Sequence, residues 1–189
     1  MTQPAQIPVR DRLPALSRRI DRPVVLVGLM GAGKSTVGRK LAMLLGKSFV
    51  DADDAIEQAA QMRIAEIFAR YGEAHFRDGE RRVIARLIEE RHGVIATGGG
   101  AFVNDETRRL ILERGIAVWI DCPVATLVER TARRNTRPLL QGGDPSEILT
   151  RLHAERARFY AEAPIRVISE QVPHQETAWS IIGAIDQWL

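Results

Sequence analysis

The chain has 189 residues and a mass of 21.1 kDa, with 45% apolar and 27% charged residues and a formal net charge of +3. These values are typical of one globular domain and exclude a wholly disordered chain, a collagen-like chain and simple repeats. The sequence has no apolar run of about 18 residues, and so small a cationic excess does not argue for a nucleic-acid or membrane partner.

Residues 1–22 are polar, carry Pro and Arg, and lack a periodic apolar face, so we predict a flexible N-terminal extension. The extension lacks the apolar core of a secretory signal. Its Arg content would suit a transit peptide, but Asp11, Asp21 and the low Ser content argue against one. Residues 23–189 are predicted to form a single domain.

This domain alternates short apolar runs with amphipathic segments. The predicted strands are 24–27, 48–50, 94–97, 117–120 and 165–168, and the predicted helices are 33–45, 53–60, 63–70, 73–91, 104–113, 123–132, 146–162 and 175–188. The alternation indicates an α/β fold, with a five-stranded parallel sheet flanked by helices. Ligands of such sheets bind beyond the carboxyl ends of the strands.

The strongest motif follows the first predicted strand. Gly28–Ser35 reads GLMGAGKS and matches the phosphate-loop pattern G-x-x-x-x-G-K-[ST], between a predicted strand and a predicted helix. Its glycines let backbone N–H groups surround phosphate oxygens, and the next helix presents its positive dipole end to them. We therefore expect a nucleoside triphosphate here, with Lys34 reaching the β- and γ-phosphates and Ser35 ligating Mg²⁺. The alternative is a Gly-rich turn with an exposed Lys.

Carboxylates follow the second predicted strand at Asp51, Asp53 and Asp54. Asp51 and Asp53 face the same side if the strand continues. One carboxylate near the metal and one near an acceptor hydroxyl would serve phosphoryl transfer. The alternative is helix capping, which we favour for Asp54, while the spacing leaves both interpretations open for Asp51 and Asp53.

In combination, the motifs resemble the shikimate kinase family from about Val24 to Ala163. In the family's order they are Gly28–Ser35, Phe49–Asp53, Ile64–Phe68, Tyr71–Arg77 with Glu80, Thr97–Gly100, Thr136–Leu140, and Glu155-Arg156 with Tyr160. The resemblance implies a three-layer P-loop fold like that of nucleoside-monophosphate kinases, with an acceptor-binding segment at about 51–91 and a mobile lid at about 133–145. It also implies phosphorylation of the 3-hydroxyl of shikimate by ATP with Mg²⁺, giving shikimate 3-phosphate and ADP in aromatic amino-acid biosynthesis.

The resemblance assigns the nucleotide and the metal to the phosphate loop and two later arginines. The implied nucleotide-binding residues are Gly31, Ala32, Gly33, Lys34, Ser35, Thr36, Arg130 and Arg137, and the implied metal residues are Ser35 and Asp51. Arg130 matches an arginine that lies against adenine. Arg137 matches a lid arginine that swings onto the phosphates, and it is an implied catalytic residue together with Lys34 and Asp53.

For the acceptor, the resemblance implies contacts with Asp53, Arg77, Arg156, Gly98, Gly99 and Gly100. Asp53 matches the aspartate that orients or deprotonates the attacking hydroxyl. Arg77 and Arg156 match the arginines that grip the carboxylate, a role that suits their forked donors. The three glycines match the backbone against the ring. Many members carry a proline between the second arginine and the tyrosine; here Ala157-Arg158-Phe159 stand there, so Arg158 is a competing candidate.

Each of these residues also has a purely structural interpretation when it is taken alone. Arg77 could lie on the surface, the glycines could form a plain loop, and Arg156 could pair with Glu155; their joint order within a phosphate-loop chain favours a site. Cys122 is predicted to be a buried small residue rather than a nucleophile. His75 and His92 are predicted to lie at the surface or at helix ends, without metal-ligand spacing.

Two rival functions remain at this point. The nearer is a kinase of another small acceptor, such as gluconate or a nucleotide. Gluconate also has a carboxylate, whereas a nucleotide acceptor needs a pocket for its base. The other is a nucleotide-binding regulatory or nucleic-acid-associated protein, which would want interleaved basic and aromatic residues, whereas aromatic residues are only 5% here. We expect a cytoplasmic monomer that binds shikimate and ATP, with no nucleic-acid or membrane partner.

Overall fold

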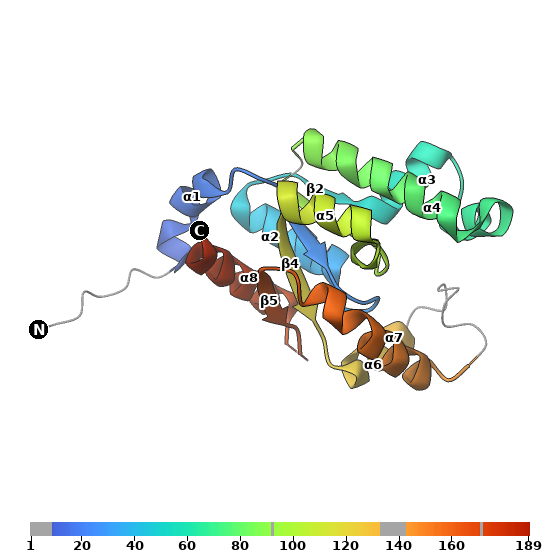
Figure 1. Cartoon of the computed structure of the whole chain (residues 1–189). Coiled ribbons are helices and arrows are strands. Elements are labelled where there is room, and N and C mark those ends of the chain that lie inside the picture. The colour runs from blue at the N-terminus through green and yellow to red at the C-terminus, as the bar shows by residue number, and fades with distance from the viewer. Residues whose placement is uncertain (1–8, 92, 133–142, 171) are drawn as a thin grey trace, which may run out of the picture.

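The computed structural model describes residues 9–91, 93–132, 143–170 and 172–189 (Figure 1). In chain order the elements are α1 (Val9–Arg19), β1 (Val24–Val27), α2 (Lys34–Leu45), β2 (Phe49–Asp51), α3 (Ala52–Ala60), α4 (Ile64–Glu89), β3 (Val94–Ala96), η1 (Ala101–Val103), α5 (Asp105–Arg114), β4 (Ile116–Asp121), α6 (Val124–Ala132), α7 (Pro145–Tyr160), β5 (Ile165–Ile168) and α8 (His174–Trp188). All five predicted strands are confirmed to within one residue at each end. The two helices predicted over 63–70 and 73–91 form the single element α4, which is kinked at Gly72.

The five strands form one sheet in the order β2-β3-β1-β4-β5, and every neighbouring pair is parallel. The central strand β1 is fully buried because helices cover both faces of the sheet, which explains its continuous apolar run. All the strands therefore point their carboxyl ends toward one edge of the sheet. The predicted fold class, an α/β fold with a five-stranded parallel sheet flanked by helices, is confirmed.

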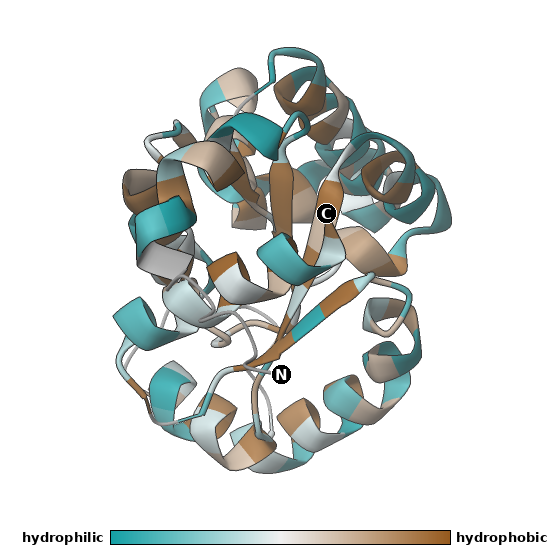
Figure 2. Cartoon of the chain, turned by 90° about the vertical axis from the view of Figure 1, so that its left-hand side faces the viewer, coloured by the Kyte–Doolittle hydropathy of each residue, from teal (hydrophilic) through white to brown (hydrophobic). Residues whose placement is uncertain are grey.

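Helices cover the two faces of the sheet in two separate layers (Figure 1). On one face, α2 contacts β1, β2 and β3 and packs against α8, which also contacts β5. Because parallel crossovers are right-handed, α4, α5 and α7 lie on the opposite face, where α5 contacts both α4 and β4. Figure 2 shows the apolar strands inside this arrangement, between helices with hydrophilic outer sides.

The prediction of a flexible extension over 1–22 is wrong for residues 9–19, which form α1. Leu16 and Ile20 are buried in the core and Leu13 packs against it, so one face of this segment is apolar at helical spacing. Ser17 Oγ donates a hydrogen bond to the Leu45 carbonyl at the end of α2, at 2.6 Å. Arg19 pairs with Asp186 in α8 at 3.1 Å. The helix α1 therefore packs against the C-terminal helix α8.

The pair α3 and α4 extends from the end of β2 and has a small core of its own. Ile56, Ile67 and Phe76 form this second apolar cluster, which is separate from the main core. Gly72 has φ 78° and ψ 174°, a conformation that a residue with a side chain rarely adopts, and it lets α4 change direction. This packing fixes α3 and α4 relative to each other, so both helices can carry site residues.

Candidate functional site

The phosphate loop, Gly28–Ser35, connects the central strand β1 to α2 at the carboxyl edge of the sheet. Gly28 has φ 138°, and a Cβ there would lie 2.5 Å from the Ile120 carbonyl oxygen, so only glycine fits. The side chain of Lys34 is buried, and its Nζ donates to the carbonyls of Gly28 and Leu29, each at 2.8 Å. The ammonium group therefore lies across the start of the loop, close to the backbone N–H groups expected to face an anion.

A hydroxyl and a carboxylate meet beside this loop. Ser35 Oγ donates to Asp51 Oδ2 at 2.5 Å, and Asp51 Oδ1 accepts from the backbone N–H of Asp53 at 3.1 Å. Asp51 is therefore the N-cap of α3 as well as a partner of the phosphate loop. The preference for Asp54 as the cap is wrong, because α3 begins at Ala52, too early for Asp54 to precede it.

Gly98–Gly100, which we call the glycine loop, follows β3 closely. It lies between Arg77 on α4 and Arg156 on α7. A Cβ at Gly98 would lie 2.7 Å from Asp53 Oδ1 and 3.2 Å from Glu80 Oε1. A Cβ at Gly100 would collide with the guanidinium of Arg77. The absence of side chains in this loop is what lets Asp53 on α3 and Arg77 on α4 approach the same stretch of backbone.

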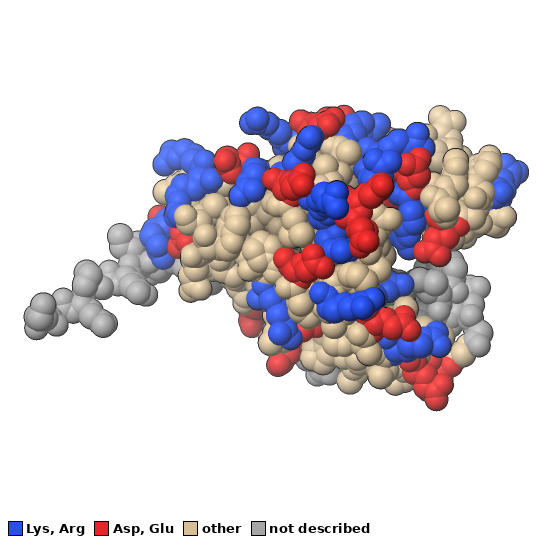
Figure 3. Space-filling view, in the orientation of Figure 1, with Lys and Arg blue, Asp and Glu red and all other residues tan. Residues whose placement is uncertain are grey.

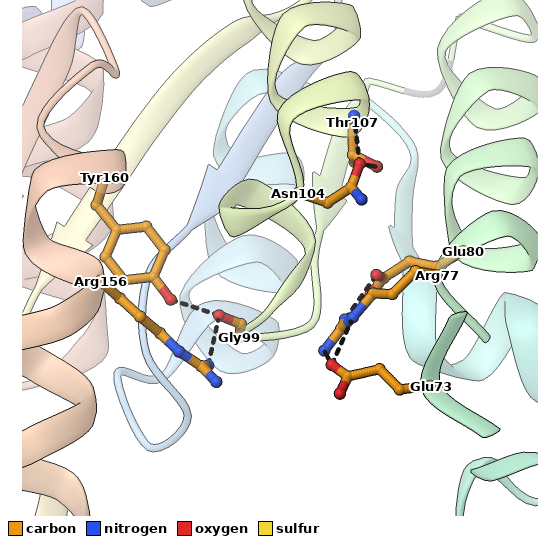
Figure 4. A network of polar contacts seen from close by, with 8 residues as sticks. All are labelled: Glu73, Arg77, Glu80, Gly99, Asn104, Thr107, Arg156 and Tyr160. Atoms are coloured by element: carbon orange, nitrogen blue, oxygen red, sulfur yellow. Dashed lines mark hydrogen bonds and ion pairs between the residues drawn. The ribbon is translucent and has the colours of Figure 1, made fainter. Parts of the chain in front are cut away.

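Arg77 is held between two carboxylates of its own helix (Figure 4). It pairs with Glu80 at 2.7 Å and with Glu73 at 3.2 Å. Burial lowers the pKa of Arg77, but the charges and hydrogen bonds of Glu80 and Glu73 more than offset this, and the pKa lies above its ordinary value. Burial raises the pKa of Glu80, whose side chain is only 1% exposed, and Arg77 offsets part of that rise.

Glu80 has no role that the sequence motifs assign, and the structure places it in the site. Its carboxylate orients the fork of Arg77 from the buried side. No local pattern in the sequence gives this role, because Glu80 is an ordinary i+3 neighbour of Arg77 on an amphipathic helix, and such pairs are common at the surface.

Arg156 reaches the glycine loop from α7, on the other side. Its Nη1 donates to the Gly99 carbonyl at 3.2 Å, and the Tyr160 hydroxyl donates to the same oxygen (Figure 4). Arg158, the competing candidate, is exposed, and its guanidinium lies 4.5 Å from the centroid of the Phe159 ring. Geometry therefore favours Arg156 over Arg158 as the arginine of the site.

On its other side the phosphate loop borders residues from α6 and from the start of α8. Arg130 Nη2 donates to the Glu170 carbonyl at 2.8 Å, and its Nη1 lies 3.5 Å from the Ala32 carbonyl oxygen. His174, which sequence reasoning missed, packs so closely on Gly33 that a Cβ there would lie 3.0 Å from its Cε1. Burial lowers the pKa of His174, and the positive charges of Arg130 and Lys40 lower it further.

Several predicted residues lie at the margin of the site or outside the described residues. Thr36 follows Ser35 on α2 and is half-buried. Arg137, most of the predicted lid at 133–145, and His92 lie outside the described residues. Cys122 is buried, as predicted, and burial raises the pKa of its thiol, which disfavours the thiolate. His75 is exposed, as predicted.

The parts of the chain that the structure describes hold neither a side-chain cluster for a metal ion nor a membrane-spanning helix. There, no group of three or more His, Cys, Asp or Glu side chains is arranged to hold a metal ion. No helix in the same parts is both long and apolar enough to cross a membrane. On the face drawn in Figure 3, Lys and Arg side chains are interspersed with Asp and Glu.

The arrangement as a whole suits the transfer of a phosphoryl group to an anionic acceptor. The phosphate loop and the glycine loop are neighbours, since a Cβ at Gly99 would lie 3.1 Å from the backbone nitrogen of Met30. Asp53 lies at the glycine loop with an oxygen that could accept a proton, and Arg77 and Arg156 reach the same loop from opposite sides. An acceptor carboxylate would match these two guanidinium forks.

Comparisons with known proteins identify relatives over nearly the whole chain. A family model described as shikimate kinase matches residues 30–186. A shikimate kinase of Novosphingobium aromaticivorans is 63% identical over 178 residues, covering 92% of each chain. A shikimate kinase of Paramagnetospirillum magneticum is 55% identical over 161 residues, covering 85% of this chain and 83% of the relative.

Solved structures agree with these sequence matches. The shikimate kinase from Acinetobacter baumannii, solved in complex with shikimate, superposes with a TM-score of 0.83 at 39% identity, covering 88% of this chain and 93% of that one. A gluconokinase from Sinorhizobium meliloti gives a TM-score of 0.60 at 15% identity, covering 89% and 94%. At that identity the gluconokinase shows a shared fold alone.

Proposed function

We infer how this site works from an established premise: the chain belongs to the shikimate kinase family. Its activity is that of a shikimate kinase, the ATP-using kinase of the shikimate pathway. We propose that the phosphoryl acceptor is the 3-hydroxyl of shikimate, and that the residues at the glycine loop hold the acceptor. The cytoplasmic localisation and the monomeric state stay predictions.

One observation carries the proposal for the acceptor: Asp53, Arg77 and Arg156 converge on the glycine loop, which in turn touches the phosphate loop. Shikimate has a carboxylate at one end of its ring and hydroxyls at the other. The two guanidinium forks bind the carboxylate with charge-assisted hydrogen bonds. The ring lies against the glycine backbone, and the hydroxyl end then faces Asp53 and the phosphate loop.

In the proposed reaction the 3-hydroxyl oxygen attacks the γ-phosphorus of ATP, and the bond to the β,γ-bridging oxygen breaks to release ADP. Asp53 orients the hydroxyl and accepts its proton. Lys34 leaves the Gly28 and Leu29 carbonyls to contact the β- and γ-phosphates, and it neutralises charge that spreads over the transferring group. Arg130 lies beside the adenine, and Arg137, outside the described residues, is assigned to the phosphates by resemblance alone.

The donor set beside the phosphate loop fits Mg²⁺. The ion prefers oxygen ligands, keeps several waters, and binds through one or two carboxylates together with substrate phosphates. Ser35 Oγ, at the start of α2, and Asp51 Oδ2, at the end of β2, are two such oxygens, 2.5 Å apart. When bound there, Mg²⁺ would supply positive charge that neutralises the phosphate oxygens of the nucleotide. We propose Ser35 as a direct ligand and Asp51 as a partner through water.

The proposal is tested by identifying the product. The protein is incubated with ATP, Mg²⁺ and shikimate, and the product is examined by ³¹P and ¹H nuclear magnetic resonance. We expect one phosphate ester, with phosphorus coupled to the proton on C3, and no product when a chelator removes Mg²⁺. An ester on another hydroxyl would refute the proposed orientation of the ring, and full activity without a divalent cation would refute the metal assignment.

A further inference from the structure

The Gly99 carbonyl oxygen accepts hydrogen bonds from two side chains of the same helix. Arg156 and Tyr160 stand one helical turn apart on α7, so their side chains leave the same face. Arg156 Nη1 lies 3.2 Å from this oxygen, and the Tyr160 hydroxyl also donates to it (Figure 4). A carbonyl oxygen has two lone pairs, so these two donors saturate it.

Of the two donors, Tyr160 is the fixed one. Its side chain is 2% exposed, and its ring lies 6.5 Å from that of Phe102 and 5.9 Å from that of Trp119, measured between centroids. Burial raises the pKa of Tyr160 to about 12, against the opposing effect of Arg156, so the hydroxyl keeps its proton and donates throughout the physiological range. Arg156, by contrast, is half-buried and has further N–H donors to offer.

The acceptor of these bonds is fixed as well. Gly99 lies against the phosphate loop, so that a Cβ there would lie 3.1 Å from Met30 N and 3.6 Å from the Leu29 carbonyl carbon. Gly99 thus connects α7, which carries Arg156, to the loop that holds the phosphates. A change in the hydrogen bonds to the Gly99 carbonyl therefore changes the position of the Arg156 guanidinium relative to both substrates.

We propose that Tyr160 is a positioning residue for shikimate binding, which acts through Arg156: by bonding the Gly99 carbonyl, it satisfies that oxygen and sets the guanidinium of Arg156 for the acceptor carboxylate. Without the tyrosine hydroxyl, the oxygen's second lone pair is unsatisfied, and Arg156 is drawn more fully onto the Gly99 carbonyl. Fewer of its donors then face the substrate. This inference rests on the proposed contact between Arg156 and the carboxylate.

The test is the substitution Tyr160→Phe, which removes only the hydroxyl and keeps the stacked ring. The loss of one such hydrogen bond is expected to raise the KM for shikimate about three- to tenfold. The KM for ATP and kcat at saturating shikimate should stay within about twofold, because neither the phosphate loop nor Asp53 loses a contact. A rise of both KM values together, or no rise in either, would overturn the proposal.

A matched control lies on the same helix. His153 contacts Asp121 at 3.4 Å, one turn before Arg156 and away from the glycine loop. His153→Ala removes an anchor of α7 without touching Gly99, and it should leave the KM for shikimate within about twofold. An equal rise in this variant would mean that α7 needs anchoring in general, and would overturn the specific role of Tyr160.

A double-substitution cycle separates this inference from the proposed function. If Tyr160 acts through Arg156, its hydroxyl has nothing left to position in an Arg156→Ala background. There, Tyr160→Phe should change the KM for shikimate by less than about twofold. A full effect there would overturn the inference while leaving the role of Arg156 intact. An unchanged KM for shikimate in Arg156→Ala alone would instead contradict the proposed function.

Discussion

The two halves of the site are built in different ways. The phosphate loop is one contiguous stretch of backbone between β1 and α2, with Lys34 and Ser35 at its end. The acceptor half is assembled from side chains of three helices, namely Asp53 on α3, Arg77 on α4 and Arg156 on α7, around the glycine loop. The first therefore depends on local backbone conformation, and the second depends on tertiary packing.

Under the proposed function, this difference gives the two halves separate roles. Backbone N–H groups and a helix dipole bind any polyphosphate of suitable length, because they contact charge and not shape. In the proposed function, selection of the acceptor falls to the forks of Arg77 and Arg156, whose planar donors require a carboxylate at a set distance from the reacting hydroxyl. Substitutions in one half should accordingly leave binding to the other half intact.

The largest effect is expected for Asp53→Asn, which keeps the shape of the side chain and removes its ability to take a proton. We expect kcat to fall about 10²- to 10⁴-fold. The dissociation constant of ATP, measured by calorimetry, should change little because Asp53 lies at the glycine loop. A kcat near that of the unchanged protein would show that Asp53 only binds the acceptor.

The next largest effect is expected for Lys34→Met, which removes the ammonium group from the phosphate loop. We expect kcat to fall about 10²- to 10³-fold, because one donor to the transferring group is lost. The dissociation constant of shikimate should stay within about twofold when it is measured without nucleotide. Loss of shikimate binding in this variant would show that the two halves are not separate.

Arg77→Lys tests the acceptor half with the charge retained. Lysine lacks the planar fork, so the KM for shikimate should rise about 10- to 100-fold, while the KM for ATP stays nearly constant. Steady-state kinetics with each substrate varied in turn gives both values. Arg81→Lys is the matched control, because Arg81 stands one turn further along α4 and pairs with Asp78 at the surface. A parallel loss of affinity for ATP in Arg77→Lys would mean that Arg77 is structural.

The smallest effect concerns His174, at the border of the nucleotide side. Its pKa is lowered in the folded protein, so the unfolded chain takes up a proton first as the pH falls below about 6.5. The stability that depends on neutral His174 is complete above that pH and is lost as the pH falls toward the lower, folded pKa. In urea unfolding at about pH 8 and about pH 5, His174→Gln should therefore lose less stability than the unchanged protein.

His75→Gln serves as the control for this comparison, because His75 is exposed on α4. A loss in His174→Gln equal to that of the unchanged protein would contradict the assigned effect of burial on His174.

Features that depend on local sequence are easier to predict than features that depend on tertiary packing. Gly28–Ser35 is recognisable because its function depends on neighbouring residues, and β1, β3 and most of β4 are recognisable because burial on both faces makes them continuous apolar runs. The family resemblance supplied the acceptor residues, which spacing alone left ambiguous. The role of Tyr160 depends on a contact across the fold with Gly99, and that of Glu80 depends on its burial beside Arg77, which an i+3 pair on a helix does not reveal in sequence.

The N-terminal helix was missed although its signal was present. Leu13, Leu16 and Ile20 stand at helical spacing, but Pro14 and the surrounding arginines suggested an irregular segment. Its burial against α2 and α8 stabilises what propensity alone would not, since isolated helices of this length are marginal in water. The sequence favours Asp54 as an N-cap because it stands directly before Ala55-Ile56, whereas in the structure α3 begins at Ala52, directly after β2, and Asp51 is the cap.

We propose that this site selects shikimate among small phosphoryl acceptors. The most direct measurement is the release of ADP from ATP with Mg²⁺, in parallel reactions with shikimate, gluconate, nucleoside monophosphates and buffer alone. We predict rapid release with shikimate and release at the buffer rate with every other acceptor. Release with shikimate no faster than with buffer, or faster release with gluconate or a nucleotide, would contradict the account.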